Sequence, residues 1–273
     1  MGFLTEAIAD LERDWLGVAR PAPAAVLAES GWSPDRPAPP GVDFCPKCGG
    51  SVGAGEYRAS PAPAGCRECR ARRFPWNEVV RLGAYRDPLR GWVHAIKFTK
   101  WDAMGRALGR RLGESVREAQ LANANAPAKN SEAVGAPRAA IDLVIPMPST
   151  WRRRARRGVD HAAVIASGVA RELDAPVCQA LQRLARPPQW TVPPSRRRDN
   201  VRRSIRPRRI AASLVRDARL VLVDDVTTSR STLIEAARVL RALGAASITV
   251  AILAAADPPG RRARTTSPGN PER

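Results

Sequence analysis

Two apolar segments near the C-terminal end, with a helical pattern between them, constrain the fold more than any other feature of the chain. Leu220–Val223 and Ser247–Leu253 are apolar runs of the kind found in strands buried on both faces. The segment 231–243 between them carries apolar residues at helical spacing, and Gly244 follows as a typical helix stop. These segments predict a strand, a helix and a second, parallel strand, which is the repeating unit of α/β proteins.

The first of these strands ends in two adjacent carboxylates, Asp224 and Asp225, followed by a loop rich in hydroxyl groups. Ligands of parallel α/β sheets bind at the carboxyl ends of the strands, so we expect both carboxylates to face a ligand. Hydroxyls of Thr228, Ser229 and Thr232, with the amides of a helix N-terminus, suit a phosphate. Paired carboxylates suit sugar hydroxyls or water-bound Mg2+. The pattern therefore predicts a sugar phosphate site.

Four of the five cysteines form two C-x2-C pairs, Cys45/Cys48 and Cys66/Cys69, separated by 17 residues. This spacing predicts a structural four-cysteine Zn2+ site, in which a closed tetrahedron leaves no position for a substrate. Two disulfides are one alternative, although cytosolic thiols stay reduced. A rubredoxin-like iron site is another, since ligand softness alone does not exclude iron. The fifth cysteine, Cys178, lies in an apolar stretch and is expected to be a buried small hydrophobe.

Composition divides the chain into four parts. Residues 1–40 begin with a short amphipathic helical pattern and continue as a Pro- and Ala-rich linker. Residues 41–76 hold the cysteine module, 79–256 the α/β domain with a disordered insertion at about 120–139, and 257–273 a disordered tail. We expect a cytoplasmic protein, because no apolar run is long enough to span a membrane and the N-terminus carries acids where a signal peptide is basic.

The chain is strongly basic, with 45 Lys+Arg against 26 Asp+Glu and a formal net charge of +19. This charge suits an anionic partner such as nucleic acid or a phosphorylated metabolite, whereas the codon bias of a GC-rich genome explains the same excess of Arg. The clusters 152–157 and 196–209 lie near Trp151 and Trp190, and basic grooves with aromatic platforms are typical of single-stranded DNA binding. A solvated Arg-rich surface is the alternative.

A strand that ends in two acids also occurs in ATPases, receivers and dehydrogenases. The chain has no G-x-x-x-x-G-K-[ST] motif, however, and no G-x-G-x-x-G motif that follows a strand. His94 and His161 lack the spacing of metal ligands, so each is expected to be solvated or part of the core.

Four ordered segments make the chain similar to the ComF family, competence-associated proteins that place a four-cysteine zinc module ahead of a type I phosphoribosyltransferase fold. The segments are GAYRDPLRGWVHAIKF (83–98), VIPMPSTWRRRARRGVDHA (144–162), QWTVPPSRRRDNVRRSI (189–205) and VLVDDVTTSRSTL (221–233). The resemblance covers about residues 43–255. It implies an α/β protein with a phosphoribosyltransferase-like parallel sheet flanked by helices, preceded by a small zinc ribbon. It also implies 5-phosphoribosyl-1-pyrophosphate with Mg2+ as the ligand.

The resemblance also implies roles for individual residues. Asp224 and Asp225 are the implied catalytic residues and hold the ribose hydroxyls, while the loop 148–157 lies near the pyrophosphate. Gln189 and Asn200 lie on or beside a mobile loop that closes over the site. Pyrophosphate is displaced at the anomeric carbon through an oxocarbenium-like state, so the protein mainly positions groups and neutralises charge. The implied ligand-binding residues are Lys97, Arg157, Arg197, Thr228, Ser229, Arg230, Ser231 and Thr232.

The chain departs from the family pattern at two places. Arg230 stands where the family has glycine in its phosphate loop, a residue that permits a left-handed backbone and close approach to phosphate. Its guanidinium could reach the phosphate instead, at a backbone cost on the order of 1 kcal/mol. Asp160 and His161 replace the usual Asn-Gln. Two function classes therefore stay open: a phosphoribosyltransferase, or a non-catalytic accessory protein that binds single-stranded DNA and acts with the DNA-uptake machinery. Homodimerisation and the acceptor substrate also stay open.

Overall fold

The computed structural model describes residues 20–35, 43–53, 55–58, 65–124, 140–149, 160–184, 204–209 and 211–256. The chain divides into two compact units, Met1–Trp32 and Ser33–Arg273. The described part of the first unit contains one helix, α2 (Pro23–Glu29), within the segment that the sequence predicted as a linker. Proline in the first turn and the helix-forming residues Ala, Leu and Glu after it account for this difference.

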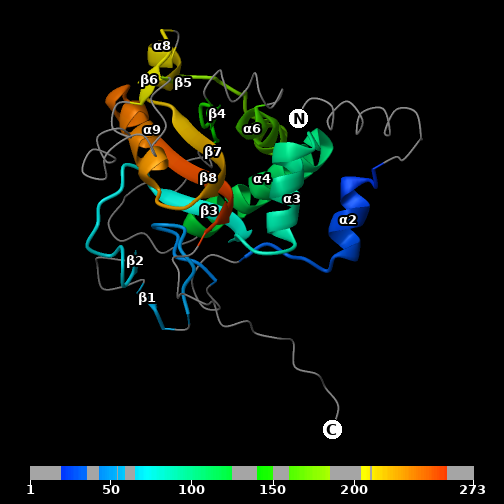
Figure 1. Ribbon diagram of the computed structural model, residues 1–273. Helices are drawn as coiled ribbons and strands as arrows, with labels where there is room; N and C mark the ends of the chain where they lie inside the picture. The colour runs from blue at the N-terminus through cyan, green and yellow to red at the C-terminus, as the bar shows by residue number, and fades with distance from the viewer. Residues whose placement is uncertain are drawn as a thin grey trace, which may run out of the picture. The chain divides into compact units, whose positions relative to one another are not determined.

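The second unit is built on a parallel four-stranded sheet. Its order is β3 (Glu78–Ala84), β8 (Ser247–Ala255), β7 (Arg219–Thr227) and β4 (Leu143–Pro146), as Figure 1 shows. The strands β7 and β8 are joined by α9 (Ser231–Ala242), and Gly244 follows this helix with a φ of 92°. The predicted strand–helix–strand unit is confirmed, with the glycine in a conformation that other residues rarely adopt.

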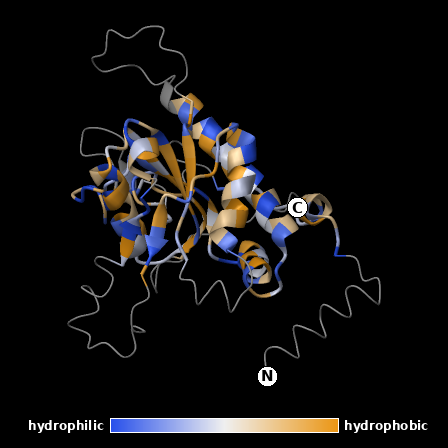
Figure 2. Ribbon diagram, turned by 90° about the horizontal axis from the view of Figure 1, so that it is seen from above, coloured by the Kyte–Doolittle hydropathy of each residue, from blue (hydrophilic) through white to orange (hydrophobic). Residues whose placement is uncertain are grey.

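Helices lie on both faces of the sheet (Figure 1). On one face, α4 (Asp102–Ala124) packs against β3 and β8, α6 (His161–Leu173) packs against β4 and β7, and α3 (Leu89–Phe98) lies beside α4. The other face carries α9, whose Leu233 and Leu240 share a core cluster with Leu220 and Leu222 of β7. In Figure 2 the sheet strands are hydrophobic, whereas the helices beside them mix hydrophobic and hydrophilic residues, as expected of a buried sheet between amphipathic helices.

The contact between α4 and α6 depends on glycine. A Cβ atom at Gly109 would lie 2.2 Å from the carbonyl oxygen of Ile165, and one at Gly168 would lie 2.3 Å from that of Arg106. The two backbones therefore approach more closely than any larger residue permits. Helix α4 continues to Ala124, so the first residues of the predicted insertion are helical, while 125–139 lie outside the described residues.

Two small antiparallel hairpins complete the described fold of the second unit. β1 (Tyr57–Arg58) pairs with β2 (Gly65–Cys66) in the cysteine module, and β5 (Leu181–Arg183) pairs with β6 (Ile205–Pro207), which precedes the short helix α8 (Ala211–Val215). Glu235 of α9 accepts hydrogen bonds from the Ser204 hydroxyl (3.0 Å) and the Ile205 amide (3.1 Å), which ties the second hairpin to the sheet domain. None of the described helices combines the length and apolarity that crossing a membrane requires.

Candidate functional site

The predicted carboxylate pair lies in the last part of β7, at the carboxyl edge of the sheet. The side chain of Asp224 accepts a hydrogen bond from the Asp225 amide at 2.9 Å, and the side chain of Asp225 accepts one from the Val226 amide at 2.5 Å. Lys97, in the last turn of α3, forms an ion pair with Asp225 at 2.9 Å, and both side chains are about four-fifths buried, at 19% and 20% exposure. The structure thus brings together three of the residues predicted for the site.

Burial, and after it the negative charge of Asp225, raise the pKa of Asp224 from 3.8 to about 8. The Asp225 amide and the positive charges of Lys97 and Arg183 act in the opposite direction on this pKa. The carboxyl group of Asp224 is therefore largely protonated at neutral pH, which allows it to donate a hydrogen bond. A neutral carboxyl beside a carboxylate suits a pair of sugar hydroxyls, each of which both donates and accepts.

The residues 227–232, here termed the phosphate loop, connect the carboxylate pair to the first turn of α9. Thr228 and Ser229 are exposed, and the hydroxyls of Ser229 and Ser231 are hydrogen-bonded at 2.8 Å. Helix α9 begins at Ser231 without a side-chain capping bond from the residue before it. A helix N-terminus flanked by hydroxyl groups provides unsatisfied amide donors and a favourable dipole for an anion.

Arg230, where the family resemblance implied a glycine, adopts the left-handed conformation with a φ of 61°. This conformation costs a residue other than glycine about 1 kcal/mol. Its Nε donates a hydrogen bond of 2.5 Å to the carbonyl oxygen of Cys48, so the side chain extends to the cysteine module. The left-handed backbone expected at this position is confirmed. The guanidinium, which the sequence analysis considered as a phosphate ligand, is hydrogen-bonded to the cysteine module.

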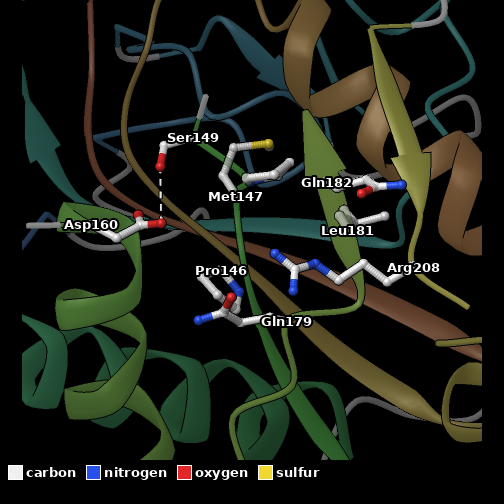
Figure 3. A pocket seen from close by; sticks show the side chains of 9 residues that line it. Pro146, Met147, Ser149, Asp160, Gln179, Leu181, Gln182 and Arg208 are labelled. Carbon is white, nitrogen blue, oxygen red and sulfur yellow. Dashed lines mark hydrogen bonds between the residues drawn. The ribbon is translucent and has the colours of Figure 1, made fainter. Parts of the chain in front are cut away.

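The loop that follows β4 contains a small cavity of about 10 Å3, which is close to the volume needed by one water molecule (Figure 3). Its lining combines the end of β4, the start of α6 and the second hairpin. The Ser149 hydroxyl donates a hydrogen bond of 2.9 Å to the carboxylate of Asp160. The lining residues are Pro146, Met147, Pro148, Ser149, Asp160, Gln179, Leu181, Gln182 and Arg208.

Several predicted site residues lie outside the described residues, so their roles stay predictions. They are Arg157, Gln189, Arg197 and Asn200, together with Trp151, Trp190 and most of the two Arg-rich clusters. The two histidines agree with their predicted states, because His161 is 6% exposed and His94 is exposed beside Phe98. Cys178 is partly buried against the core, and this burial raises the pKa of its thiol.

The thiols of Cys45, Cys48, Cys66 and Cys69 form one buried cluster, with every pair of sulfur atoms within 4.8 Å. The Cys45–Cys69 and Cys66–Cys69 sulfur distances are 3.5 Å, and the Cys48–Cys66 distance is 3.7 Å. Metal–sulfur bonds of about 2.3 Å in a tetrahedron place the sulfurs about 3.8 Å apart, so the cluster fits a tetrahedral metal. All four are free thiols, which excludes the predicted disulfide alternative in this structure.

The segment 45–50, here termed the cysteine knuckle, is held by the sheet domain through consecutive carbonyl groups. Each of the four carbonyl oxygens from 46 to 49 accepts a hydrogen bond from a different residue; three of these residues belong to the sheet domain, and the fourth, Trp76, packs into its core just before β3. The pairs are Pro46 with the Val79 amide (2.6 Å), Lys47 with Trp76 Nε1 (3.0 Å), Cys48 with Arg230 Nε (2.5 Å) and Gly49 with Arg81 Nη1 (2.9 Å).

Arg81 was missed by the sequence reasoning, although it is central to this contact. Its side chain is 1% exposed, forms an ion pair of 2.6 Å with Asp35 and donates a hydrogen bond of 3.0 Å to the Ser51 hydroxyl. Its guanidinium also lies 5.1 Å from the centre of the Phe44 ring. The signal that could have found it is a charged residue among the apolar residues that follow Glu78 in the strand EVVRLGA, because a buried charge requires partners.

Comparisons with known proteins identify the domain in which these residues lie. The model of the phosphoribosyl transferase domain matches residues 159–268, which include the carboxylate pair, the phosphate loop and α9. The chain therefore contains a phosphoribosyltransferase domain, built on a parallel sheet flanked by helices, with a four-cysteine cluster in its N-terminal region.

The chain is also similar to two curated proteins over most of its length. The DNA utilization protein YhgH of Salmonella typhi is 29% identical over 211 residues, which are 77% of this chain and 82% of the relative. Competence protein F of Haemophilus influenzae is 28% identical over 209 residues, 76% of this chain and 82% of the relative. The chain is a homologue of these proteins, and its resemblance to the ComF family is confirmed.

A solved structure described as the allosteric regulatory enzyme of purine biosynthesis is also matched, with a TM-score of 0.32 and 21% identity. The match covers 54% of this chain and 25% of the other.

Proposed function

We propose that the chain binds 5-phosphoribosyl-1-pyrophosphate together with Mg2+ at the carboxyl edge of β7. The observation that carries this proposal is the contiguity of the carboxylate pair with the phosphate loop and the N-terminus of α9. A sugar phosphate presents hydroxyls and a phosphate in one molecule and can contact both features at once, whereas a free phosphate would contact the loop alone.

In this proposal, Asp224 and Asp225 hold the ribose hydroxyls. The hydroxyls of Thr228, Ser229, Ser231 and Thr232 and the loop amides surround the 5′-phosphate. Lys97 reduces the repulsion between the acidic pair and an anionic ligand, because it neutralises Asp225 at 2.9 Å. Mg2+ would enter with the pyrophosphate, since it is commonly held by carboxylates and substrate phosphates rather than by a protein cage. Arg157 and Arg197 would contact the pyrophosphate.

The reaction that such a site supports is transfer of the ribosyl phosphate group to an acceptor nucleophile. The bond between the anomeric carbon and pyrophosphate breaks, pyrophosphate leaves with the bonding electrons, and the acceptor forms the new bond to carbon. The protein contributes orientation and charge stabilisation, and no side chain acts as a nucleophile. We propose zinc as the metal of the cysteine cluster and the cytosol as the compartment, because four metal-binding thiols persist where thiols are kept reduced.

The names of the relatives support a role in DNA uptake or in the use of the DNA taken up. We therefore retain a second candidate function, the binding of single-stranded DNA. A specific observation favours it: a groove of about 610 Å3 beside the cysteine module is lined by three basic and three aromatic side chains. These are Lys47, Arg72, Arg73, Tyr57, Phe74 and Trp76, and the rings of Phe74 and Trp76 are stacked at 4.8 Å. Basic charge with aromatic rings suits a nucleic acid strand.

Ligand-induced thermal stabilisation tests the first candidate against the second. We expect 5-phosphoribosyl-1-pyrophosphate with Mg2+ to raise Tm by several degrees, because a ligand at 100 times its Kd stabilises the folded state by about 2.7 kcal/mol. Ribose 5-phosphate should give a smaller rise in Tm. If the second candidate function holds, oligo-dT should also raise Tm, and this rise should disappear with added salt. A rise with oligo-dT and none with either sugar phosphate would favour the second candidate and contradict the first.

A further inference from the structure

One side chain connects the phosphate loop to the cysteine knuckle. Arg230 lies in the loop, and its Nε donates a hydrogen bond of 2.5 Å to the carbonyl oxygen of Cys48, a residue 182 positions earlier in the chain. Cys48 is 3% exposed, and its thiol belongs to the four-sulfur cluster. The residue that would bind the metal through its sulfur is therefore the residue that holds the loop through its carbonyl oxygen.

The knuckle is shaped to admit this side chain. A Cβ atom at Gly50 would lie 2.8 Å from Nη2 of Arg230, so a side chain at this position would displace the guanidinium. Gly49 has a φ of 73°, and a Cβ there would lie 2.8 Å from a methyl group of Val79. The two glycines thus allow the knuckle to contact both the sheet and Arg230, in a backbone conformation that suits glycine.

The remaining contacts of the knuckle do not involve the phosphate loop. The carbonyls of residues 46, 47 and 49 are bound by Val79, Trp76 and Arg81, which lie in or just before β3. We therefore expect the knuckle to stay docked when Arg230 is replaced, whereas the loop loses its hydrogen bond to Cys48. Within the loop, the carbonyl of Arg230 accepts the Ile234 amide at 2.9 Å, so the tethered residue also begins the hydrogen bonding of α9.

We propose that Arg230 is a positioning residue, which holds the phosphate loop in its ligand-binding conformation as long as the cysteine knuckle is folded around its metal. The metal dependence of the loop follows from the contacts alone, while its effect on sugar phosphate affinity rests on the proposed function. Because coupling between two sites is reciprocal, a ligand of the loop then also strengthens metal retention. The left-handed position at which the family resemblance implied glycine is occupied here by Arg230, whose side chain contacts the cysteine module.

Hydrogen exchange of the segment 227–234 tests this proposal in the full chain. The variant Arg230→Gly removes the tether and suits the left-handed backbone, while Arg238→Ala removes an exposed arginine from the same helix as a matched control. We expect chelation of the metal to accelerate exchange of this segment about tenfold in the wild type and in Arg238→Ala, the loss expected for one charged hydrogen bond. In Arg230→Gly, exchange should already be fast and should change less than twofold.

Two results would overturn the proposal. One is a wild-type loop whose exchange is insensitive to metal removal, and the other is an equal response in Arg230→Gly, which would indicate general loosening of the module. These results do not depend on any ligand, so they decide the proposal even if the proposed function fails.

A metal-release assay adds the ligand. With 5-phosphoribosyl-1-pyrophosphate and Mg2+ present, transfer of zinc to a chromogenic chelator should slow about fivefold in the wild type, within the usual range of coupling between sites. It should not slow in Arg230→Gly. Calorimetric binding by both proteins with equal protection of the metal would contradict the coupling through Arg230. Absence of binding by the wild type would instead count against the proposed function, and hydrogen exchange would still decide the role of Arg230.

Discussion

The raised pKa of Asp224 predicts an unusual dependence of stability on pH. Burial and the charge of Asp225 raise this pKa from 3.8 to about 8. Because the folded-state pKa lies above the unfolded value, the protonated carboxyl stabilises the fold fully below pH 3.8, and this contribution is lost as the pH rises through about 8. The substitution Asp224→Asn keeps the acceptor for the Asp225 amide and never acquires a charge.

The size of the effect follows from the two pKa values. At about 1.4 kcal/mol per pKa unit, the rise from 3.8 to about 8 corresponds to at most roughly 6 kcal/mol. This is the largest amount by which ionisation of Asp224 can lower the free energy of unfolding. We expect about half of this limit, because Asp224 is only partly buried from solvent and its surroundings relax on ionisation. The loss accumulates between pH 3.8 and about 8, so about half of it is already present at pH 6. Asp224→Asn should therefore be about 3 kcal/mol more stable than the wild type at pH 9.5, and about 1.5 kcal/mol more stable at pH 6.

Urea denaturation of the metal-loaded protein, followed by circular dichroism at the two pH values, measures this difference. Glu118→Gln removes an exposed carboxylate from α4 and serves as the control, with the same difference from the wild type at both pH values. An Asp224→Asn variant whose advantage is the same at pH 6 and pH 9.5 would contradict a raised pKa of Asp224 in the folded protein. A wild type that gains on the variant as the pH rises would also refute it. The expected outcome would mean that the site lowers stability, as functional sites often do.

Three further predictions concern the contacts around the site. Arg81→Met should lower the free energy of unfolding by about 3 kcal/mol in urea denaturation, because Asp35 loses its buried partner. Adding Asp35→Asn should recover part of this loss, and additive effects of the two substitutions would contradict a direct pairing. Chelation of the metal should lower Tm by several degrees in calorimetry, since the cysteine cluster would lose its ligand bonds, and an unchanged Tm would exclude a structural metal. Lys97→Met should raise the pKa of Asp224 further by removing a charge that lowers it, so the stability loss should move to higher pH in urea titrations; an unchanged midpoint would contradict this.

The strand–helix–strand unit could be predicted because its signals are local. Continuous apolar runs, a helical pattern and Gly244 specify β7, α9 and β8, and the carboxyl-edge rule then places Asp224 and Asp225. The cysteine cluster could also be predicted, since two C-x2-C pairs at this spacing restrict the geometry on their own. The helix α2 was missed because its Pro-rich surroundings outweighed its short run of helix-forming residues.

The contacts between the cysteine module and the sheet domain could not be predicted in the same way. The hydrogen bond from Arg230 to Cys48 joins residues 182 positions apart, and neither residue carries a local signal for the other. The sequence showed that Arg230 occupies a glycine position, but the direction of its side chain depends on where the knuckle docks. That docking depends in turn on Arg81, whose charge in an apolar strand indicated a need for partners without identifying them.

We proposed above that the carboxylate pair and the phosphate loop bind a phosphoribosyl ligand. The most direct test is calorimetric titration of the zinc-loaded protein with 5-phosphoribosyl-1-pyrophosphate in the presence of Mg2+, beside the double variant Asp224→Asn/Asp225→Asn. We expect micromolar binding by the wild type and at least a hundredfold weaker binding by the variant, because the variant has no carboxylate that accepts hydrogen bonds. Equal affinity of the two proteins, or no binding by the wild type, would contradict the proposal.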